Sequence, residues 1–324
     1  MSSGEVAVIG AGAWGTALAI QAARAGRATV LWARDPGRAS AITATRENPR
    51  LPGARLPAEV KVTASLEGVD AGLLLLAVPV QHLREVAALL PDTAAMVVCA
   101  KGVEHGSLRL PLEILGALHP RVSAAVLTGP NFAGEIAAGL PAAAVVASAD
   151  AGLRALVAER VGTTGFRLYG NDDPTGAQIG GAAKNVVAIA AGAVIGAGLG
   201  ENARAALVTR GLAELRRLAV GLGGRAETVS GLSGVGDLLL TCTGGASRNY
   251  SLGLALGRGE ALADILGARS GVTEGVATAP ALVARAAAAG LELPICAAVA
   301  DLVGGRMTLR QAIAALLSRP RRDE

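Results

Sequence analysis

Lysine is scarce in this chain: only Lys61, Lys101 and Lys184 occur among its 30 lysine and arginine residues. Since arginine supplies the rest of the basic charge, a retained lysine suggests a task that guanidinium cannot perform, such as proton transfer near neutral pH. Lys101 and Lys184 lie among small residues and are candidates for an active site, with ordinary exposed lysines as the alternative. Lys61 lies between two valines and is expected to face solvent on a strand.

Aromatic residues, cysteine and histidine are also few. Aromatics make up 2% of the chain and no basic stripe is interleaved with them, which excludes a typical nucleic-acid-binding protein. The three cysteines form no CxxC pair and share no metal-ligand spacing with the three histidines. We therefore expect a reduced, cytoplasmic protein without a metal. We expect no signal peptide, because the N-terminus leads directly into a strand pattern, and no membrane span, because the most apolar helical stretch, 186–200, is short.

The length of 324 residues suggests about two domains, and the 52% hydrophobic content can fill their cores. The first half alternates short continuous apolar runs with helical patterns, which is typical of a parallel sheet covered on both faces. From residue 173 onward only helical patterns occur. We predict an α/β fold with a doubly wound Rossmann-type domain at 1–172 and an all-α domain at 173–324.

The expected strands and helices have the following bounds. Strands are predicted at 6–9, 28–33, 71–78, 95–100 and 124–128, with two further candidates at 142–147 and 166–169. Helices are predicted at 13–25, 36–45, 80–90, 108–118, 173–199, 202–222, 247–256, 273–289 and 308–317.

A cofactor motif follows the first predicted strand. Gly10, Gly12 and Gly15 form the pattern GxGxxG, a helix opens from it, and a second strand ends about 20 residues later, as a dinucleotide site requires. Gly10 permits a tight turn, and Gly12 lets backbone N–H groups approach a pyrophosphate. Gly15 lets the helix pack on the strand, with its positive end toward the anion.

The residues that end the second strand give conflicting indications about the cofactor. Asp35 could accept a hydrogen bond from the ribose 2′-hydroxyl of NAD, whereas Arg34, with Arg38 one turn on, could pair with the 2′-phosphate of NADP. We favour NADP with tolerance for NAD.

A second group of polar residues lies in the helical half. Lys184 and Asn185 occur in the first half of the long predicted helix, and further downstream come Asp237, Thr241, Ser247, Arg248 and Asn249. This set offers a proton donor, a carboxylate to orient it, and donors for a phosphate at a predicted helix N-terminus. Asp237 as an ordinary loop or cap residue and Ser247 as a plain N-cap remain open.

In these segments the chain resembles the bacterial NAD(P)-dependent glycerol-3-phosphate dehydrogenases. The resemblance runs nearly end to end and includes VIGAGAWGTALA (8–19), AKG (100–102), TGPNFAGEIAAGLPAA (128–143), GGAAKNVVAIAAG (180–192), ENARAALVTRGLAE (201–214), SGVGDLLLTCTGGASRNYSLG (233–253) and VTEG (272–275). It implies interconversion of dihydroxyacetone phosphate and sn-glycerol 3-phosphate with NADP or NAD, an architecture like that of 6-phosphogluconate dehydrogenase, and a homodimer.

The resemblance also implies roles by position. Lys184 matches the proton-transfer residue, and the other catalytic candidates are Asp237, Lys101, Asn185 and Thr241. The substrate-binding candidates are Lys101, Gly129, Asn131, Asp237, Ser247, Arg248 and Asn249. The cofactor-binding candidates are Gly10, Gly12, Ala13, Trp14, Gly15, Arg34, Lys101, Ala133, Arg248, Val272 and Glu274. The chain departs from the usual pattern, which often has Ser at Ala13 and Val80, Ser or Thr at Asn131, and an aliphatic residue at Thr273.

In the expected mechanism Lys184 protonates the developing alkoxide while Lys101 and Asn185 hold the carbonyl oxygen. We expect burial and Lys101 to lower the pKa of Lys184, with Asp237 opposing that shift. Two alternatives remain at this stage. A β-hydroxyacid dehydrogenase would need a carboxylate site in place of the Ser-Arg-Asn triplet, and a non-catalytic nicotinamide-binding regulator need not keep Lys184 and Asp237 together.

Overall fold

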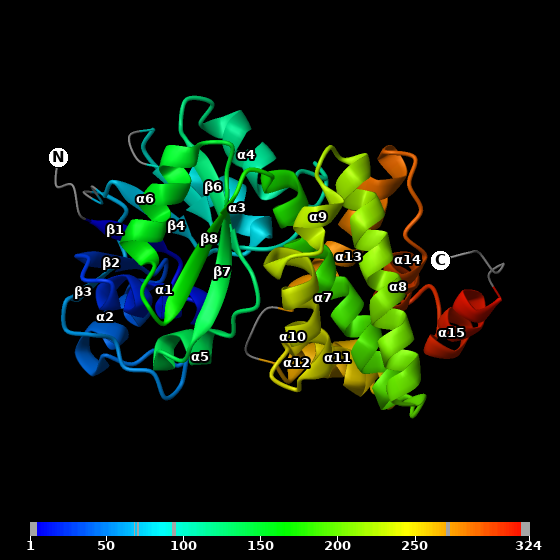
Figure 1. The fold of residues 1–324 in the computed structure, drawn as a ribbon. Coiled ribbons are helices and arrows are strands. Elements are labelled where there is room, and N and C mark those ends of the chain that lie inside the picture. Colours follow the sequence, from blue (N-terminus) through cyan, green and yellow to red (C-terminus); the bar gives the residue numbers. More distant parts are fainter. Residues whose placement is uncertain (1–4, 68, 70, 93–94, 270–272, 319–324) are drawn as a thin grey trace. The chain divides into compact units, whose positions relative to one another are not determined.

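The computed structural model of the chain describes residues 5–318, apart from 68, 70, 93–94 and 270–272. The chain divides into two compact units. The first contains Met1–Lys101 and Leu110–Gln178, and the second contains Gly102–Arg109 and Ile179–Glu324. The first unit is built on a β-sheet, whereas helices make up the regular structure of the second unit as far as it is described (Figure 1). The predicted fold class is confirmed.

The sheet of the first unit has eight strands in the order β3-β2-β1-β4-β5-β6-β7-β8. Neighbouring strands are parallel except β6 and β7, which are antiparallel. The strands are β1 (Val6–Ile9), β2 (Thr29–Trp32), β3 (Val60–Thr63), β4 (Leu73–Leu76), β5 (Ala95–Val98), β6 (Ala124–Thr128), β7 (Ala142–Ala147) and β8 (Phe166–Asn171).

Central strands are buried on both faces, which is why they read as continuous apolar runs. In β4, Leu73 and Leu75 belong to the core cluster beneath α1 and α6, while Leu74 and Leu76 point to the opposite face and are also buried. Helices therefore cover both faces of the sheet, as the sequence predicts. The helices of this unit are α1 (Ala13–Arg24), α2 (Pro36–Thr45), α3 (Val80–Ala87), α4 (Pro111–Leu118), α5 (Ala133–Ala138) and α6 (Ala151–Val161).

One strand pair departs from the predicted parallel sheet, because β7 is antiparallel to β6. The chain leaves β6 and reaches β7 through α5, which has six residues and packs on α1. A helix of that length spans about 9 Å, whereas a five-residue strand spans about 17 Å. α5 therefore covers only about half the length of β6, and β7 runs antiparallel to β6.

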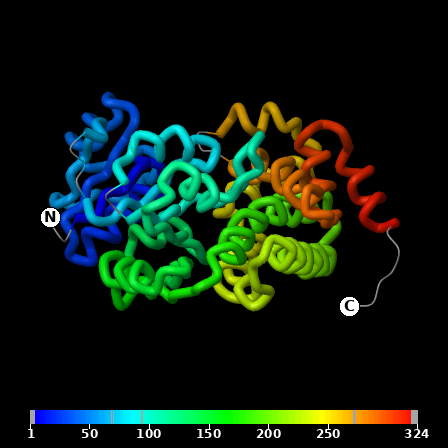
Figure 2. Tube along the Cα trace, turned by 90° about the horizontal axis from the view of Figure 1, so that it is seen from above, coloured from blue at the N-terminus to red at the C-terminus, as the bar shows by residue number. Residues whose placement is uncertain are grey.

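The second unit surrounds one long helix. In Figures 1 and 2, α7 (Pro174–Gly196) lies among α8, α10, α11 and α13. The other helical elements are α8 (Gly200–Gly221), α9 (Ala226–Val229), the π-helical turn η1 (Leu232–Gly236), α10 (Asp237–Thr243), α11 (Arg248–Gly257), α12 (Leu262–Gly267), α13 (Glu274–Ala288), α14 (Pro294–Val303) and α15 (Leu309–Leu317). The five helices predicted after residue 172 are confirmed, whereas α9, η1, α10, α12 and α14 were not predicted.

By length and composition α7 could cross a membrane, since its most apolar 18-residue window has a mean hydropathy of 1.6. However, 83% of that window is buried within the protein itself. A core helix of a globular unit has the same character, because it is apolar on every side and meets other helices all round. We therefore interpret α7 as the core helix of the second unit.

Glycines let α7 and α11 approach each other closely. A Cβ at Gly192 would lie 2.0 Å from the carbonyl oxygen of Tyr250, and a Cβ at Gly253 would lie 1.9 Å from that of Ile189. Gly196 and Gly257 repeat the arrangement one turn further on. The backbones of the two helices are therefore in direct contact. This contact fixes the positions of Asn185 on α7 and Asn249 on α11, which lie one turn earlier on their helices.

Glu214 on α8 ties that helix to α14. Its carboxylate is 3% exposed and accepts hydrogen bonds from the backbone N–H groups of Ile295 at 2.7 Å and Cys296 at 3.2 Å. Burial raises the pKa of Glu214, and the two N–H donors oppose that shift. Glu214 thus caps the N-terminus of another helix, which gives a structural reason for the glutamate that ends the ENARAALVTRGLAE segment.

Candidate active site

Lys184 lies in the middle of α7, and its side chain is 12% exposed. Its ammonium nitrogen donates hydrogen bonds to Oδ1 of Asp237 and to Oγ1 of Thr241, each at 2.8 Å. The Asp237 side chain is 1% exposed. A buried carboxylate and a nearly buried ammonium at this distance stabilise each other, because each would otherwise lose its hydration without compensation. The structure thus brings together three of the residues named as catalytic candidates.

Asp237 and Thr241 lie one turn apart on α10, so both side chains are on the same face of the helix. The Thr241 hydroxyl donates to the backbone oxygen of Asp237 at 2.6 Å, which leaves its oxygen oriented to accept from Lys184. Asp237 is the first residue of this helix and does not lie in a loop.

The glycine-rich run before Asp237 is required by close packing. A Cβ at Gly234 would lie 1.8 Å from the oxygen of Val229, and a Cβ at Gly180 on α7 would lie 2.5 Å from the oxygen of Ser233. The π-helical turn η1 therefore lies directly against α7. Because α10 follows η1 directly, this contact places α10 next to α7, the helix that bears Lys184.

Asn185 and Asn249 form a polar contact between α7 and α11. The Asn249 amide donates to Oδ1 of Asn185 at 2.8 Å, and its own Oδ1 accepts from the backbone N–H of Gly275 at 3.0 Å. A Cβ at Gly275 would lie 2.6 Å from that Asn249 oxygen, so only glycine fits there. Asn249 therefore joins the start of α13 to the residue that follows Lys184.

Ser247 and Arg248 lie at the N-terminus of α11. Ser247 is the N-cap, and its hydroxyl accepts from the N–H of Tyr250 at 3.2 Å, so the plain capping role is present. Arg248 is exposed. Arg269 donates to the backbone oxygen of Arg248 at 2.7 Å, and its pKa is lowered by burial and by the charge of Arg248. Two guanidinium groups near one helix N-terminus favour an anion.

The GxGxxG segment has the geometry of a dinucleotide cradle. Gly10 has a φ of +119°, and a Cβ there would lie 2.9 Å from the oxygen of Ala77. A Cβ at Gly15 would lie 1.8 Å from the oxygen of Gly10, whereas the space in front of Gly12 is open. Gly12 is the N-cap of α1 and has no side chain to cap it, and the first-turn N–H groups of a helix have no partner within the helix. These residues fit a pyrophosphate.

Ala13 and Trp14, in the first turn of α1, are half-buried, and Arg34 follows β2 on the surface. Asp35 is the N-cap of α2, where its Oδ1 accepts from the N–H of Arg38 at 2.6 Å. One carboxylate oxygen of Asp35, the residue considered for the ribose of NAD, thus already accepts a hydrogen bond within the protein. The structure leaves Arg34 and Arg38 exposed.

Lys101 and the loop after β6 meet within the first unit. The Lys101 ammonium donates to the carbonyl oxygen of Gly129 at 3.1 Å. Gly129 has a φ of +141°, and a Cβ there would lie 3.0 Å from Cα of Ala144. In the same loop Oδ1 of Asn131 is buried and has no hydrogen-bond partner among the described residues. Ala133 begins α5 just beyond.

The last two cofactor candidates lie at the start of α13. Glu274 is its first residue and is half-buried. Val272 lies outside the described residues. Sequence reasoning did not single out Arg269, because arginine is the common cation of this chain and gave no contrast. It also gave Gly275 no role, although that residue ends the VTEG segment.

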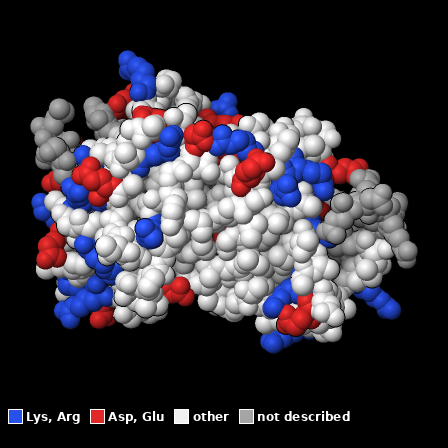
Figure 3. Space-filling view, viewed as in Figure 1, with Lys and Arg blue, Asp and Glu red and all other residues white. Residues whose placement is uncertain are grey.

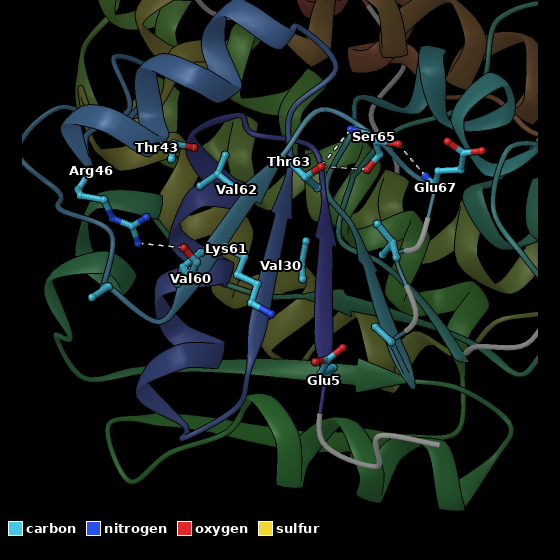
Figure 4. A pocket seen from close by; sticks show the side chains of 13 residues that line it. Glu5, Val30, Thr43, Arg46, Val60, Lys61, Val62, Thr63, Ser65 and Glu67 are labelled. Carbon is cyan, nitrogen blue, oxygen red and sulfur yellow. Dashed lines mark hydrogen bonds between the residues drawn. The ribbon is translucent and has the colours of Figure 1, made fainter.

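Other features of the described residues lie apart from these candidates. A hollow of about 690 Å³ runs along the edge strand β3, with Lys61 and Glu5 among its lining residues, and none of the candidates lines it (Figure 4). Among the described residues no group of three or more His, Cys, Asp or Glu could hold a metal. On the face seen in Figure 3, the described basic and acidic side chains are interspersed in small groups.

Comparison with known proteins decides the family. The family models described as the N-terminus and the C-terminus of NAD-dependent glycerol-3-phosphate dehydrogenase match residues 5–153 and 173–314. The chain belongs to this family. It is 58% identical to the glycerol-3-phosphate dehydrogenase [NAD(P)+] of Acidiphilium cryptum, with 79% of each chain covered. It is 48% identical to that of Parvibaculum lavamentivorans, with 99% of this chain and 98% of the relative covered.

A solved structure of a family member shares the whole fold. The crystal structure of glycerol-3-phosphate dehydrogenase from Coxiella burnetii has a TM-score of 0.94 and 36% sequence identity, and the match covers 98% of this chain and 99% of that one. The resemblance stated from the sequence is therefore confirmed. The findings support an NAD(P)-dependent oxidoreductase of this family, not a β-hydroxyacid dehydrogenase or a non-catalytic regulator.

Proposed function

We propose that this chain catalyses the reversible reduction of dihydroxyacetone phosphate to sn-glycerol 3-phosphate with NADPH or NADH, and that Lys184 transfers the proton. The observation that carries the assignment of Lys184 is its nearly buried ion pair with Asp237, completed by the hydroxyl of Thr241. Lysine can release and regain a proton near neutral pH, and arginine cannot. The family membership supplies the substrate and the cofactor class.

The bound nicotinamide supplies the hydride. The residues proposed to hold the cofactor are Gly10, Gly12, Ala13, Trp14, Gly15, Arg34, Lys101, Ala133, Arg248, Val272 and Glu274. Because one Asp35 oxygen already caps α2, we favour NADPH with tolerance for NADH. Arg34→Ala should then raise KM for NADPH far more than KM for NADH, and equal effects on the two would overturn this preference.

Lys184 gives its proton to the alkoxide oxygen as the ketone carbon is reduced. In the oxidative direction the neutral amine takes the hydroxyl proton back. Asp237 and Thr241 fix the position of the nitrogen, since two of its hydrogen bonds are made to them at 2.8 Å. Asn185, held by Asn249, and Lys101 are proposed to bind the carbonyl oxygen.

Phosphate recognition is proposed for the N-terminus of α11. Ser247, Arg248 and Asn249 offer donors there, and Gly129, Asn131 and Lys101 complete the proposed substrate set. Hydrogen bonds to a charged group contribute about 1.5–3 kcal/mol. Arg248→Ala should therefore raise KM for dihydroxyacetone phosphate by about 10- to 100-fold, which steady-state kinetics would measure.

The decisive experiment follows the absorbance of reduced nicotinamide with dihydroxyacetone phosphate and with unphosphorylated dihydroxyacetone. The proposal predicts rapid oxidation of the cofactor with the phosphorylated ketone and almost none with the other. Rapid turnover of unphosphorylated dihydroxyacetone would contradict it.

We also propose the cellular setting that this activity implies. The product would supply the backbone of glycerophospholipids, and the enzyme would act in the cytoplasm as a homodimer. Residues 1–172 would form the dinucleotide-binding domain and residues 173–324 the substrate-binding domain. Sedimentation velocity at several protein concentrations would test the dimer.

A further inference from the structure

Thr273 lies at the N-terminus of the 15-residue helix α13, and its hydroxyl is buried. It is the N-cap residue, is 7% exposed, and makes no side-chain cap. Its Oγ1 has no hydrogen-bond partner among the described residues. The hydroxyl of a threonine at an N-cap ordinarily accepts a hydrogen bond from an N–H group of the first helical turn. The absence of that hydrogen bond here needs an explanation.

The explanation lies in how the first turn of α13 is already used. The N–H of Gly275 donates to Oδ1 of Asn249 at 3.0 Å, and the N–H of Val276 donates to the backbone oxygen of Thr273 at 3.2 Å. These are the two N–H groups that an N-cap side chain would take. Asn249 has therefore replaced the threonine hydroxyl in the capping role.

A buried hydroxyl that makes no hydrogen bond is unfavourable, because it loses its hydrogen bonds to water without replacement. Valine has nearly the same shape and would avoid that loss. The hydroxyl thus costs stability in the free protein, and a ligand that bonds to it would recover that loss.

The neighbouring residue indicates the chemistry of that ligand. Glu274, next in the chain, carries a carboxylate that accepts hydrogen bonds, while the Thr273 hydroxyl can donate one. Together they suit a neutral group that both donates and accepts, such as a carboxamide or a sugar hydroxyl. A phosphate suits them poorly, because Glu274 would repel it.

We propose that the Thr273 hydroxyl bonds to a neutral oxygen of the nicotinamide cofactor, in its carboxamide or its ribose. The inference rests on the proposed function, since Glu274 is a cofactor residue there. Both groups are common to NADH and NADPH. Loss of the hydroxyl should therefore lower the affinity for NADH and for NADPH by the same factor.

The test is calorimetric titration of the full-length protein with NADH and with NADPH, alongside thermal unfolding without ligand. Thr273→Val should lower the affinity for both cofactors by about 3- to 10-fold, without lowering the unfolding temperature. Thr273→Ser should bind nearly as the wild type does. The control is Thr278→Val, a buried threonine one turn further along α13, which should leave both affinities unchanged.

Each contrary result has a definite meaning. Wild-type affinity of Thr273→Val for both cofactors would overturn the inference while leaving the proposed function intact. A loss confined to NADPH would also overturn it, since the 2′-phosphate would then be the partner. If the wild-type protein bound neither cofactor, the proposed function itself would fail. Titration with the thioamide analogue of NADH, in which sulfur replaces the carboxamide oxygen, separates the carboxamide from the ribose.

Discussion

The contact between α7 and α11 gives the sharpest quantitative prediction about positioning. In Gly253→Ala the added Cβ would lie 1.9 Å from the oxygen of Ile189, whereas real Cβ atoms essentially never approach closer than 3.0 Å. The two helices must separate locally by about 1 Å, since the atoms in conflict are backbone atoms and cannot rotate away. The hydrogen bond between Asn249 and Asn185, now 2.8 Å, lies one turn away and would open beyond hydrogen-bonding distance.

Overpacking of this kind costs about 1–3 kcal/mol. For a unit of this size each kcal/mol lowers the unfolding temperature by about 2–4 °C, so we expect Gly253→Ala to unfold about 2–12 °C below the wild type. Activity should fall as well, because α11 carries Arg248 and Asn249. Differential scanning calorimetry and steady-state kinetics with dihydroxyacetone phosphate measure the two effects.

The matched control is Gly267→Ala, a helical glycine of the same unit with open space in front of it. There the substitution should be neutral or stabilise by up to about 1 kcal/mol, because alanine is a better helix former. Unfolding of Gly253→Ala at the wild-type temperature would refute the inferred backbone contact.

Three further predictions concern charge and reactivity. Because burial raises the pKa of Cys242 to about 12 and the other two cysteines are also buried, Ellman's reagent should detect no thiol in the native protein and three after unfolding. Asp150 caps α6, and the N–H of Leu153 holds its pKa below 3.8, so its charge stabilises the fold above that pH and the stabilisation is lost as the pH falls through the lowered pKa. Asp150→Asn should therefore melt below the wild type at neutral pH, and a gap that did not narrow as the pH is lowered from 3.8 would contradict this. Asp237→Asn removes the charge that favours the ammonium, so the pH at which glycerol 3-phosphate oxidation reaches half its maximal rate should move to lower values, and an unchanged profile would count against the ion pair.

The sheet was predictable from sequence because its signal is local. The continuous apolar runs of β1, β6 and β7 give their observed bounds, since strands buried on both faces need no polar alternation. The direction of β7 was not predictable from such runs. It depends on where the segment between β6 and β7 packs, and the contact of α5 with α1 is not reported by apolar periodicity.

The candidate site was partly predictable for a different reason. Lys184 stood out because lysine is rare in this chain, and the family resemblance indicated Asp237 beside it. The helix that carries Asp237 was missed, because Gly234 and Gly236 read as a turn in sequence. In the structure η1 packs closely against Val229 and α7, a tertiary contact that the local sequence does not report. The missing cap hydrogen bond of the Thr273 hydroxyl could not be predicted from sequence either, because it depends on the side chain of Asn249 from α11.

The most direct test of the central claim is the maximal rate of dihydroxyacetone phosphate reduction by Lys184→Met and Lys184→Arg, measured beside the affinity of each variant for NADPH. Proton transfer by Lys184 predicts that both variants bind the cofactor as the wild type does and that kcat falls by about 10²–10⁴-fold in each. If Lys184→Arg turned over at close to the wild-type rate, proton transfer by this residue would be excluded.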